Sequence, residues 1–273
     1  MNATGPRRWI LWLSISAATL LIAVSLAGML SPWTYIGETG IRAAEYAGND
    51  VGNLAFIVPV LLVSSWMAFR ASIAAHLVWM GALAYLVYDF LGYSLGVRFN
   101  PMFLADCGIV ALSFYALMGG LLTLPIPETV RRAPVKTTAG VLMLVGAATV
   151  LHWLWPILHI LLTGWGSPAA RDSGTLTEPV AVLDLSLAGP ACLVAGIPLL
   201  RRRPIGFAVG AIMLTFLALS SLVLVPMGLS MARRSFESGY SLCAVGLGVA
   251  TASTALLALC LRDGGAESRT ESG

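Results

Sequence analysis

The sequence predicts an all-α, polytopic bundle of transmembrane helices, and three observations support this prediction. Apolar residues make up 58% of the 273-residue chain, whereas charged residues make up only 11%. Ordinary globular proteins carry about 25% charged residues, so this chain has too little charge to cover a water-exposed surface. Eight apolar segments reach about 20 residues, the helical length that crosses a bilayer core of about 30 Å. The net charge of +3 forms no basic stripe and indicates no nucleic-acid partner.

The predicted spans follow one another with short connections. They cover roughly residues 9–30, 52–69, 72–95, 104–124, 139–163, 179–200, 205–229 and 240–261. The first span follows Arg7 and Arg8, as a secretory signal would, but its apolar run is too long and no A-x-A site follows it. We therefore expect this span to be retained. Residues 262–273 are polar and Gly-rich, which predicts a disordered tail.

The distribution of Lys and Arg predicts the orientation of the bundle. With the N-terminus in the cytoplasm, eleven of these residues lie on the inner side and five on the outer side. This excess agrees with the positive-inside rule. Arg233 and Arg234, on the outer side, are the main exception. The sequence thus predicts a multi-pass protein of the cell membrane with both termini in the cytoplasm.

Two stretches of the chain suggest an internal repeat. NLAFIVPVLLVSSWMAFR (residues 53–70) and DLSLAGPACLVAGIPLLR (residues 184–201) lie 131 positions apart and share five identities, including Pro59 with Pro190. Each stretch precedes a short Arg-containing turn and two further spans. We infer two parallel four-span repeats, residues 1–130 and 131–261, related by a pseudo-two-fold axis along the membrane normal.

Asn53 and Asp184 are equivalent positions in this repeat, and both are expected about one turn into an outward-facing helix. One interpretation is that each side chain caps free N–H groups, where the helix dipole also favours a carboxylate. The other is that each helix opens a polar site at its outer end. The proline six residues later frees a backbone carbonyl in both helices, which membranes tolerate when protein or water satisfies it.

Ionisable residues inside spans are costly and usually face a cavity or a partner. Here Asp89, Asp106, Asp184 and His159 all fall toward the outer ends of their spans, and Asp50 is expected just outside. Asp89 lies about 9 Å from the outer end of its span at 1.5 Å per residue. One-sided placement of this kind is typical of a polar site that opens outward.

The third span carries an aromatic stripe beside Asp89. Tyr85, Asp89 and Tyr93 are spaced i, i+4 and i+8, so they share one helix face. A phenol on that face can donate a hydrogen bond to the carboxylate. An interfacial aromatic belt would have the same composition.

Metal or cofactor binding has little support in the sequence. His152 and His159 are seven residues apart on nearly one face, and Asp184 or Asp89 could supply a third ligand. The i, i+4 spacing of helical zinc sites is absent, and the four cysteines form no CxxC pair. We expect no cofactor, with the two histidines as the metal-ligand candidates.

The remaining motifs concern packing. The chain has no G-x-S-x-G, H-E-x-x-H or P-loop pattern. Gly92 with Gly96, and Gly206 with Gly210, form GxxxG pairs, which indicate close helix packing and a homodimer through these faces.

The segments WMGALAYLVYDFLGYSLGVRFNPMFL (residues 79–104) and VLDLSLAGPACL (residues 182–193) resemble an uncharacterised group of bacterial eight-helix integral membrane proteins. The likeness covers chiefly the second to fourth spans and the sixth. It implies a protein of the bacterial cytoplasmic membrane and implies no activity or site residue.

Three functions are compatible with these features. The first is a small-molecule or proton- or cation-coupled transporter with an outward polar site. The others are an intramembrane enzyme acting on a lipid or isoprenoid, with His152 and His159 in acid–base or metal-binding roles, and a non-catalytic subunit of a membrane complex. The candidate substrate- or ion-binding residues are Asp184, Asp89, Asn53, His159, Tyr85, Tyr93 and Asp106.

Overall fold

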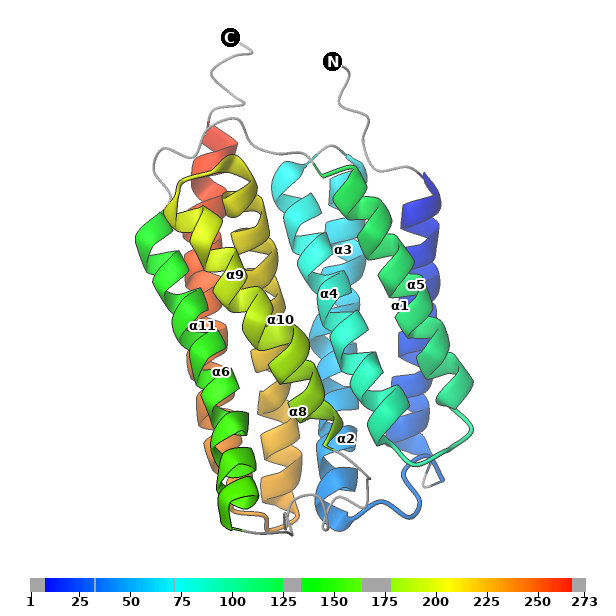
Figure 1. The fold of residues 1–273 in the computed structure, drawn as a ribbon. Helices are drawn as coiled ribbons and strands as arrows, with labels where there is room; N and C mark the ends of the chain where they lie inside the picture. The colour runs from blue at the N-terminus through cyan, green and yellow to red at the C-terminus, as the bar shows by residue number, and fades with distance from the viewer. Residues whose placement is uncertain (1–7, 32, 71, 125–133, 164–177, 267–273) are drawn as a thin grey trace.

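The computed structural model describes residues 8–31, 33–70, 72–124, 134–163 and 178–266, and these ranges are helical with short connections (Figure 1). With η denoting a π-helix, the elements are α1 (Arg8–Leu30), α2 (Gly40–Gly52), η1 (Asn53–Ile57), α3 (Val58–Phe69), α4 (Ile73–Gly96), α5 (Phe103–Leu122), α6 (Val135–Thr163), α8 (Pro179–Leu183), η2 (Asp184–Ala188), α9 (Gly189–Leu200), α10 (Pro204–Arg233) and α11 (Ser238–Ala266). The prediction of an all-α fold is confirmed.

Two groups of these elements are continuous, namely α2–η1–α3 and α8–η2–α9. The described residues therefore form eight helices that are long and apolar enough to cross a membrane. The start of α1 and the end of α11 lie on the same side of the bundle, which we call the terminal side (Figure 1). The opposite side, where α2 and α11 begin, is called the far side. The predicted tail 262–273 starts too early, because α11 continues to Ala266 and the rest lies outside the described residues.

The second helix begins twelve residues before the predicted start of its span. It starts at Gly40, with the Thr39 side chain accepting a hydrogen bond from the backbone N–H of Arg42. Its first part is too polar for a hydropathy argument, yet Asn49 and Asp50 are buried there against other helices. Asp50 therefore lies inside the helix rather than outside it, contrary to the prediction.

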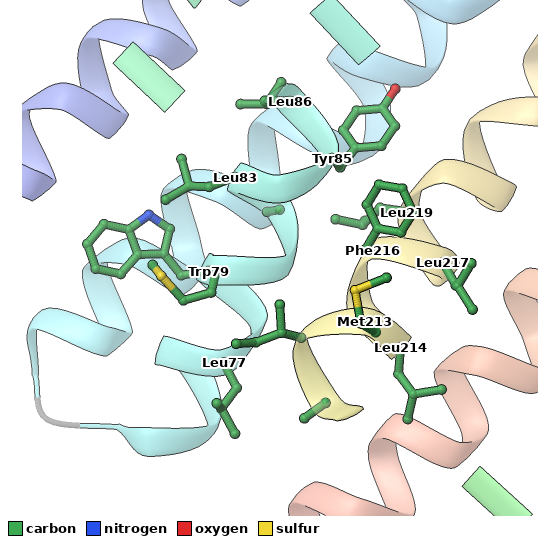
Figure 2. Packing of buried hydrophobic residues seen from close by; sticks show 14 of the residues in the cluster. Leu77, Trp79, Leu83, Tyr85, Leu86, Met213, Leu214, Phe216, Leu217 and Leu219 are labelled. Atoms are coloured by element: carbon green, nitrogen blue, oxygen red, sulfur yellow. The ribbon is translucent and has the colours of Figure 1, made fainter. Parts of the chain in front are cut away.

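The helices α4 and α10 form the centre of the bundle and pack against each other. Figure 2 shows Leu77 near Met213 and Tyr85 beside Phe216 between the two helices. Lipid tails are as apolar as these side chains, so helix association in a membrane depends on close packing rather than on water exclusion. Gly81 provides this closeness, since a Cβ there would lie 2.7 Å from the Ile212 carbonyl oxygen and would also clash with Thr215.

In each half of the chain, the second helix packs against the central helix of the other half: α2 packs against α10, and α8 packs against α4. On α2, a Cβ added to Gly48 would clash with the backbone of Met227 on α10. At positions 131 residues away from this pair, Pro179 on α8 lies against Gly96 on α4, where a Cβ would be 3.3 Å from the proline ring. Gly48 is thus equivalent to Pro179, and Gly96 is equivalent to Met227. The glycine lies on the second helix in one contact and on the central helix in the other.

A second contact repeats in the same way. A Cβ on Gly52 would lie 2.8 Å from the Val223 side chain, and one on Gly92 would lie 3.7 Å from Leu183. Gly52 is separated from Leu183, and Gly92 from Val223, by 131 positions. Gly81 also meets Ile212, which is 131 positions further along the chain, so the two central helices touch at matching residues.

The predicted GxxxG faces are covered within the chain. Gly92 and Gly96 face α8, as described above, and a Cβ on Gly206 would lie 2.5 Å from the backbone of Leu199. Close helix packing at these glycines is confirmed. The homodimer stays a prediction, but these particular faces already carry helices of the same chain.

Both 18-residue stretches contain a π-helix at the same position. The Val58 N–H donates to the Asn53 carbonyl, five residues earlier, and the Gly189 N–H donates in the same way to the Asp184 carbonyl. The next residues are Pro59 and Pro190, which have no N–H and whose rings clash with a carbonyl four residues before. The extra residue in each π-turn relieves that clash.

The capping interpretation of Asn53 and Asp184 is wrong. Asn53 lies well inside a helix that starts at Gly40, and Asp184 follows the five-residue helix that starts at Pro179. Neither side chain makes a capping hydrogen bond to the helix start. Both side chains instead belong to the polar networks described next.

Candidate functional site

A cavity of about 830 Å³ lies between the two halves, toward the far side of the bundle. The first half contributes residues of α2 and α4, and the second half contributes residues of α6, α8, η2, α9, α10 and α11. Most of the lining is apolar, with two aspartates, Asp89 and Asp184, among the polar lining residues. This is the size of a site for a small organic molecule, with few polar groups to orient it.

The cavity exists because the outer helices pack differently in the two halves. In the first half α1 packs along α5, whereas no comparably extensive packing joins α6 to α11 in the described residues. These two helices meet near the terminal side, where the Thr138 hydroxyl lies 3.6 Å from the Cys260 sulfur. Farther along, Thr149 of α6 and Val245 of α11 both line the cavity.

Asp89 is held in the first-half wall by two asparagines. The Asn49 side-chain amide donates to both carboxylate oxygens, at 3.1 and 3.0 Å, and the Asn53 amide donates to one of them at 3.2 Å. Hydrogen bonds from neutral amides stabilise a carboxylate without cancelling its charge. The two asparagines therefore fix the orientation of the Asp89 carboxyl in the cavity wall.

The predicted tyrosine stripe joins the same network, and the Tyr85 hydroxyl interacts with the Asp89 carboxyl as well as with the asparagines. The Tyr85 hydroxyl donates to the Asn53 side-chain oxygen at 2.9 Å, and the Asn49 amide also donates to the Tyr93 hydroxyl at 3.1 Å. The phenols thus orient the asparagines, and the asparagines hold the carboxylate. The predicted phenol-to-carboxylate contact is thus present at Tyr85, and the neighbouring helix adds the amide donors Asn49 and Asn53.

Asp184 lies in the second-half wall with different partners. One carboxylate oxygen accepts a hydrogen bond from the Tyr88 hydroxyl at 2.7 Å, and the other accepts one from the Trp153 indole N–H at 2.7 Å. The Tyr88 ring packs edge-on against Phe216, with ring centroids 5.4 Å apart. Aromatic faces around a carboxylate favour a cationic group, which gains both a counter-charge and cation–π contact.

Charge in the cavity is predominantly negative. Arg42 is the one arginine or lysine among the described lining residues, and its guanidinium pairs with Glu178 at 2.7 Å and with Glu45 at 3.5 Å. The Glu178 contact joins the two halves across the far side of the cavity. Because Arg42 is paired, the carboxylates of Asp89 and Asp184 have no basic side chain as a counter-ion among the described residues.

The structure separates the other predicted site residues. His152 lines the cavity, whereas His159 and Asp106 are not among its lining residues. Among the described residues, no group of three or more His, Cys, Asp or Glu side chains could hold a metal ion. The combination of both histidines with Asp184 or Asp89 as a ligand set is therefore not present.

Several residues of the site were missed at the level of sequence. Asn49 and Arg42 precede the predicted start of the second span, and Trp153 stood in a segment read only for its histidines. The polar run that precedes residue 52 was the available signal. This run resembles an exposed loop, because hydropathy cannot distinguish a polar loop from a helix whose polar face is buried.

Comparison with known proteins adds no further constraint on this site. No family model, curated protein or solved structure matches the chain.

Proposed function

We propose that this protein is a multi-pass membrane transporter, with both termini in the cytoplasm, that binds a small cationic molecule in the cavity between two parallel four-span repeats. The observation that carries the proposal is the placement of Asp89 and Asp184 in opposite halves of one apolar cavity. In other membrane proteins, intramembrane acids of this kind mark substrate and ion pathways.

The repeat is supported by contacts rather than by sequence identity. The pairs Gly48–Met227 and Pro179–Gly96 occupy equivalent positions in the two halves. The small glycine is on α2 in the first pair and on α4 in the second. The π-helices η1 and η2 also start 131 positions apart. Parallel repeats related by an axis along the membrane normal occur in transporters, whose binding sites lie at the repeat interface.

The substrate class follows from the lining. The lining contains two carboxyl groups without a basic partner, Asp89 and Asp184, and an arginine paired with Glu45. Together with the aromatic rings of Tyr88, Trp153 and Phe216, these groups favour an organic cation with an apolar body. The π-helices begin at Asn53 and Asp184, and single π-turns of this kind are frequent at functional sites.

The test uses ethidium, a fluorescent organic cation, as the probe. We expect purified protein to bind ethidium and proteoliposomes to take it up, and we expect Asp184→Asn and Asp89→Asn each to weaken binding about tenfold, the effect of about 1.4 kcal/mol. Glu237→Gln is the matched control, because Glu237 is exposed and outside the cavity lining. Equal binding by all four proteins would refute the cavity as a cation site.

A further inference from the structure

A second group of buried acids lies behind the cavity wall, in the first half of the chain. Asp50 on α2 is 0% exposed and is not among the cavity-lining residues. One of its carboxyl oxygens, Oδ2, accepts a hydrogen bond from the Tyr35 hydroxyl at 2.6 Å. The other, Oδ1, has no hydrogen-bond partner in the described part of the chain.

The space for this group is created by small residues of α1. A Cβ on Gly28 would overlap the Asp50 carboxyl and would lie 2.7 Å from the Tyr35 hydroxyl, so only glycine fits there. One turn earlier on α1, the buried Ser25 hydroxyl is positioned to donate a weak hydrogen bond to the Asp50 carboxyl.

Another carboxyl oxygen without a partner comes from α5. Asp106 is 3% exposed, and its Oδ1 likewise lacks a hydrogen-bond partner within the described ranges. Its carboxyl is near enough to that of Asp50 for the two to interact electrostatically. A Cβ on Gly108 would lie 3.1 Å from Leu20, so α1 and α5 run closely side by side at this level.

No basic side chain balances these two acids among the described residues that face them. The groups around Asp50 are Ser25 on α1, Tyr35 in the connection before α2, Asp106 on α5, and Asp89 and Tyr93 on α4. The nearby α10 places Val223 and Met227 against α2, and neither can titrate. Burial and the Asp50 carboxyl raise the pKa of Tyr35 far above its usual value, so this phenol stays a hydrogen-bond donor.

Two buried carboxylates without a cation are far less stable than a pair that has taken up a proton. A metal ion fits the group poorly, because Ca²⁺ takes six to eight oxygen ligands, and no group of three or more His, Cys, Asp or Glu side chains in the described ranges could hold a metal ion. A single proton removes one of the two negative charges and so ends the repulsion between the two carboxylates.

A row of tyrosines leads from this group to the cavity. The rings of Tyr35, Tyr46 and Tyr93 lie next to one another with centroids 5.3 Å apart at each step. Tyr46 and Tyr93 line the cavity, and the Tyr93 hydroxyl accepts a hydrogen bond from Asn49, which holds Asp89. Asp50 and Asp106 each interact electrostatically with Asp89.

We propose that Asp50 and Asp106 form a proton-binding site behind the cavity, and that a proton bound there opposes cation binding at Asp89. The first part of this proposal is independent of transport, whereas the second part rests on the proposed function. Release of the proton leaves an added negative charge near Asp89, which strengthens the attraction for a cation, so the two ligands compete as in an antiporter.

The first experiment detects the proton without any cavity ligand. Infrared difference spectra of the purified protein between pH 6 and pH 8 should contain a band of a protonated carboxyl group. Both Asp50→Asn and Asp106→Asn should reduce this band, and Asp184→Asn should keep it. Thermal stability should also rise as the pH falls, because the folded protein holds a proton that the unfolded chain releases.

The outcomes separate the two parts of the proposal. A band that survives in both Asp50→Asn and Asp106→Asn, or a stability that responds to sodium in place of pH, overturns the proton site. If the site is confirmed, ethidium affinity should rise about fivefold or more from pH 6 to pH 8, with a smaller change in Asp50→Asn. If ethidium binding has the same pH dependence in Asp50→Asn as in the wild-type protein, the competition between proton and cation is overturned and the proton site is not. A titrating band without ethidium binding instead overturns the proposed function and leaves the proton site in place.

Discussion

The segments η1 and η2 have the same backbone and different chemistry. Both are five-residue π-helices that precede a proline-containing helix of twelve residues. Asn53, which begins η1, is completely buried and connects Tyr85 to Asp89. Asp184, which begins η2, is partly exposed on the cavity wall and accepts bonds from Tyr88 and Trp153.

The difference shows that backbone shape and site chemistry are set by different residues. The proline six positions later sets the π-turn in both halves, whatever the first side chain is. The side chain at the first position of each π-helix, Asn53 or Asp184, instead matches the groups that surround it. Beside Asp89, a neutral amide can donate to the carboxylate, whereas a second carboxylate would repel it.

The largest expected effect on stability comes from Asn53→Asp, which places an aspartate at the start of both η1 and η2. Asn53→Asp removes an amide donor from a charged acceptor and adds a like charge, so we expect a loss of about 3 kcal/mol in the free energy of unfolding at pH 8. Denaturant unfolding in detergent measures this loss. At pH 5.5 the loss should shrink, because a protonated aspartic acid can again donate to Asp89.

The reciprocal exchange provides the control. Asp184→Asn keeps an oxygen that can accept from Tyr88 or Trp153, and its site is partly exposed, so we expect a change below about 1 kcal/mol. Equal destabilisation by the two exchanges would contradict the distinction between a structural position and a cavity position.

A second, smaller effect tests how the halves meet. In Gly81→Ala the new methyl group would clash with Thr215 and approach the Ile212 carbonyl, so α4 and α10 must separate. Overpacking of this kind costs about 1–3 kcal/mol. The measurement is the unfolding midpoint, compared with Gly248→Ala, where no atom lies within 4 Å of the added Cβ. A midpoint as high as that of Gly248→Ala would mean that the helices cross elsewhere.

The smallest effect concerns the ion pair that joins the halves across the cavity. Arg42→Gln removes the contact with Glu178. The Arg42 side chain is 19% exposed and the Glu178 side chain is 16% exposed. We expect a loss of about 1 kcal/mol or less, because a partly solvated pair is weakened by water and salt. High salt should reduce the difference between this variant and the wild-type protein. A loss that does not respond to salt would indicate that the arginine acts through packing instead.

Much of the fold could be predicted from hydropathy alone. The predicted limits of the spans at 9–30, 72–95 and 179–200 agree with α1, α4 and α8–α9 to within one residue at each end. The error at the second span has a clear cause. The polar side chains of Asn49 and Asp50 resemble those of a loop, and only packing against other helices makes them part of a buried helix.

The site was predicted in part, and the missing part was the set of contacts. Asp89 and Asp184 were identified because a charge inside an apolar span is costly wherever it faces. Their partners could not be identified, because Asn49 and Trp153 come from other helices. Asp106 was identified by the same argument and lies outside the cavity, since depth along a helix does not specify which neighbours surround it.

The sequence by itself determined that the chain forms apolar helices of membrane-spanning length, and it determined where prolines interrupt two of them. Those properties depend on each segment's own composition and on the geometry of proline. Only the tertiary structure decided that Asp89 and Asp184 share a cavity while Asp50 and Asp106 lie behind it. That division depends on which helix faces pack together, and it follows from glycines such as Gly28 and Gly81 meeting particular neighbours across the bundle.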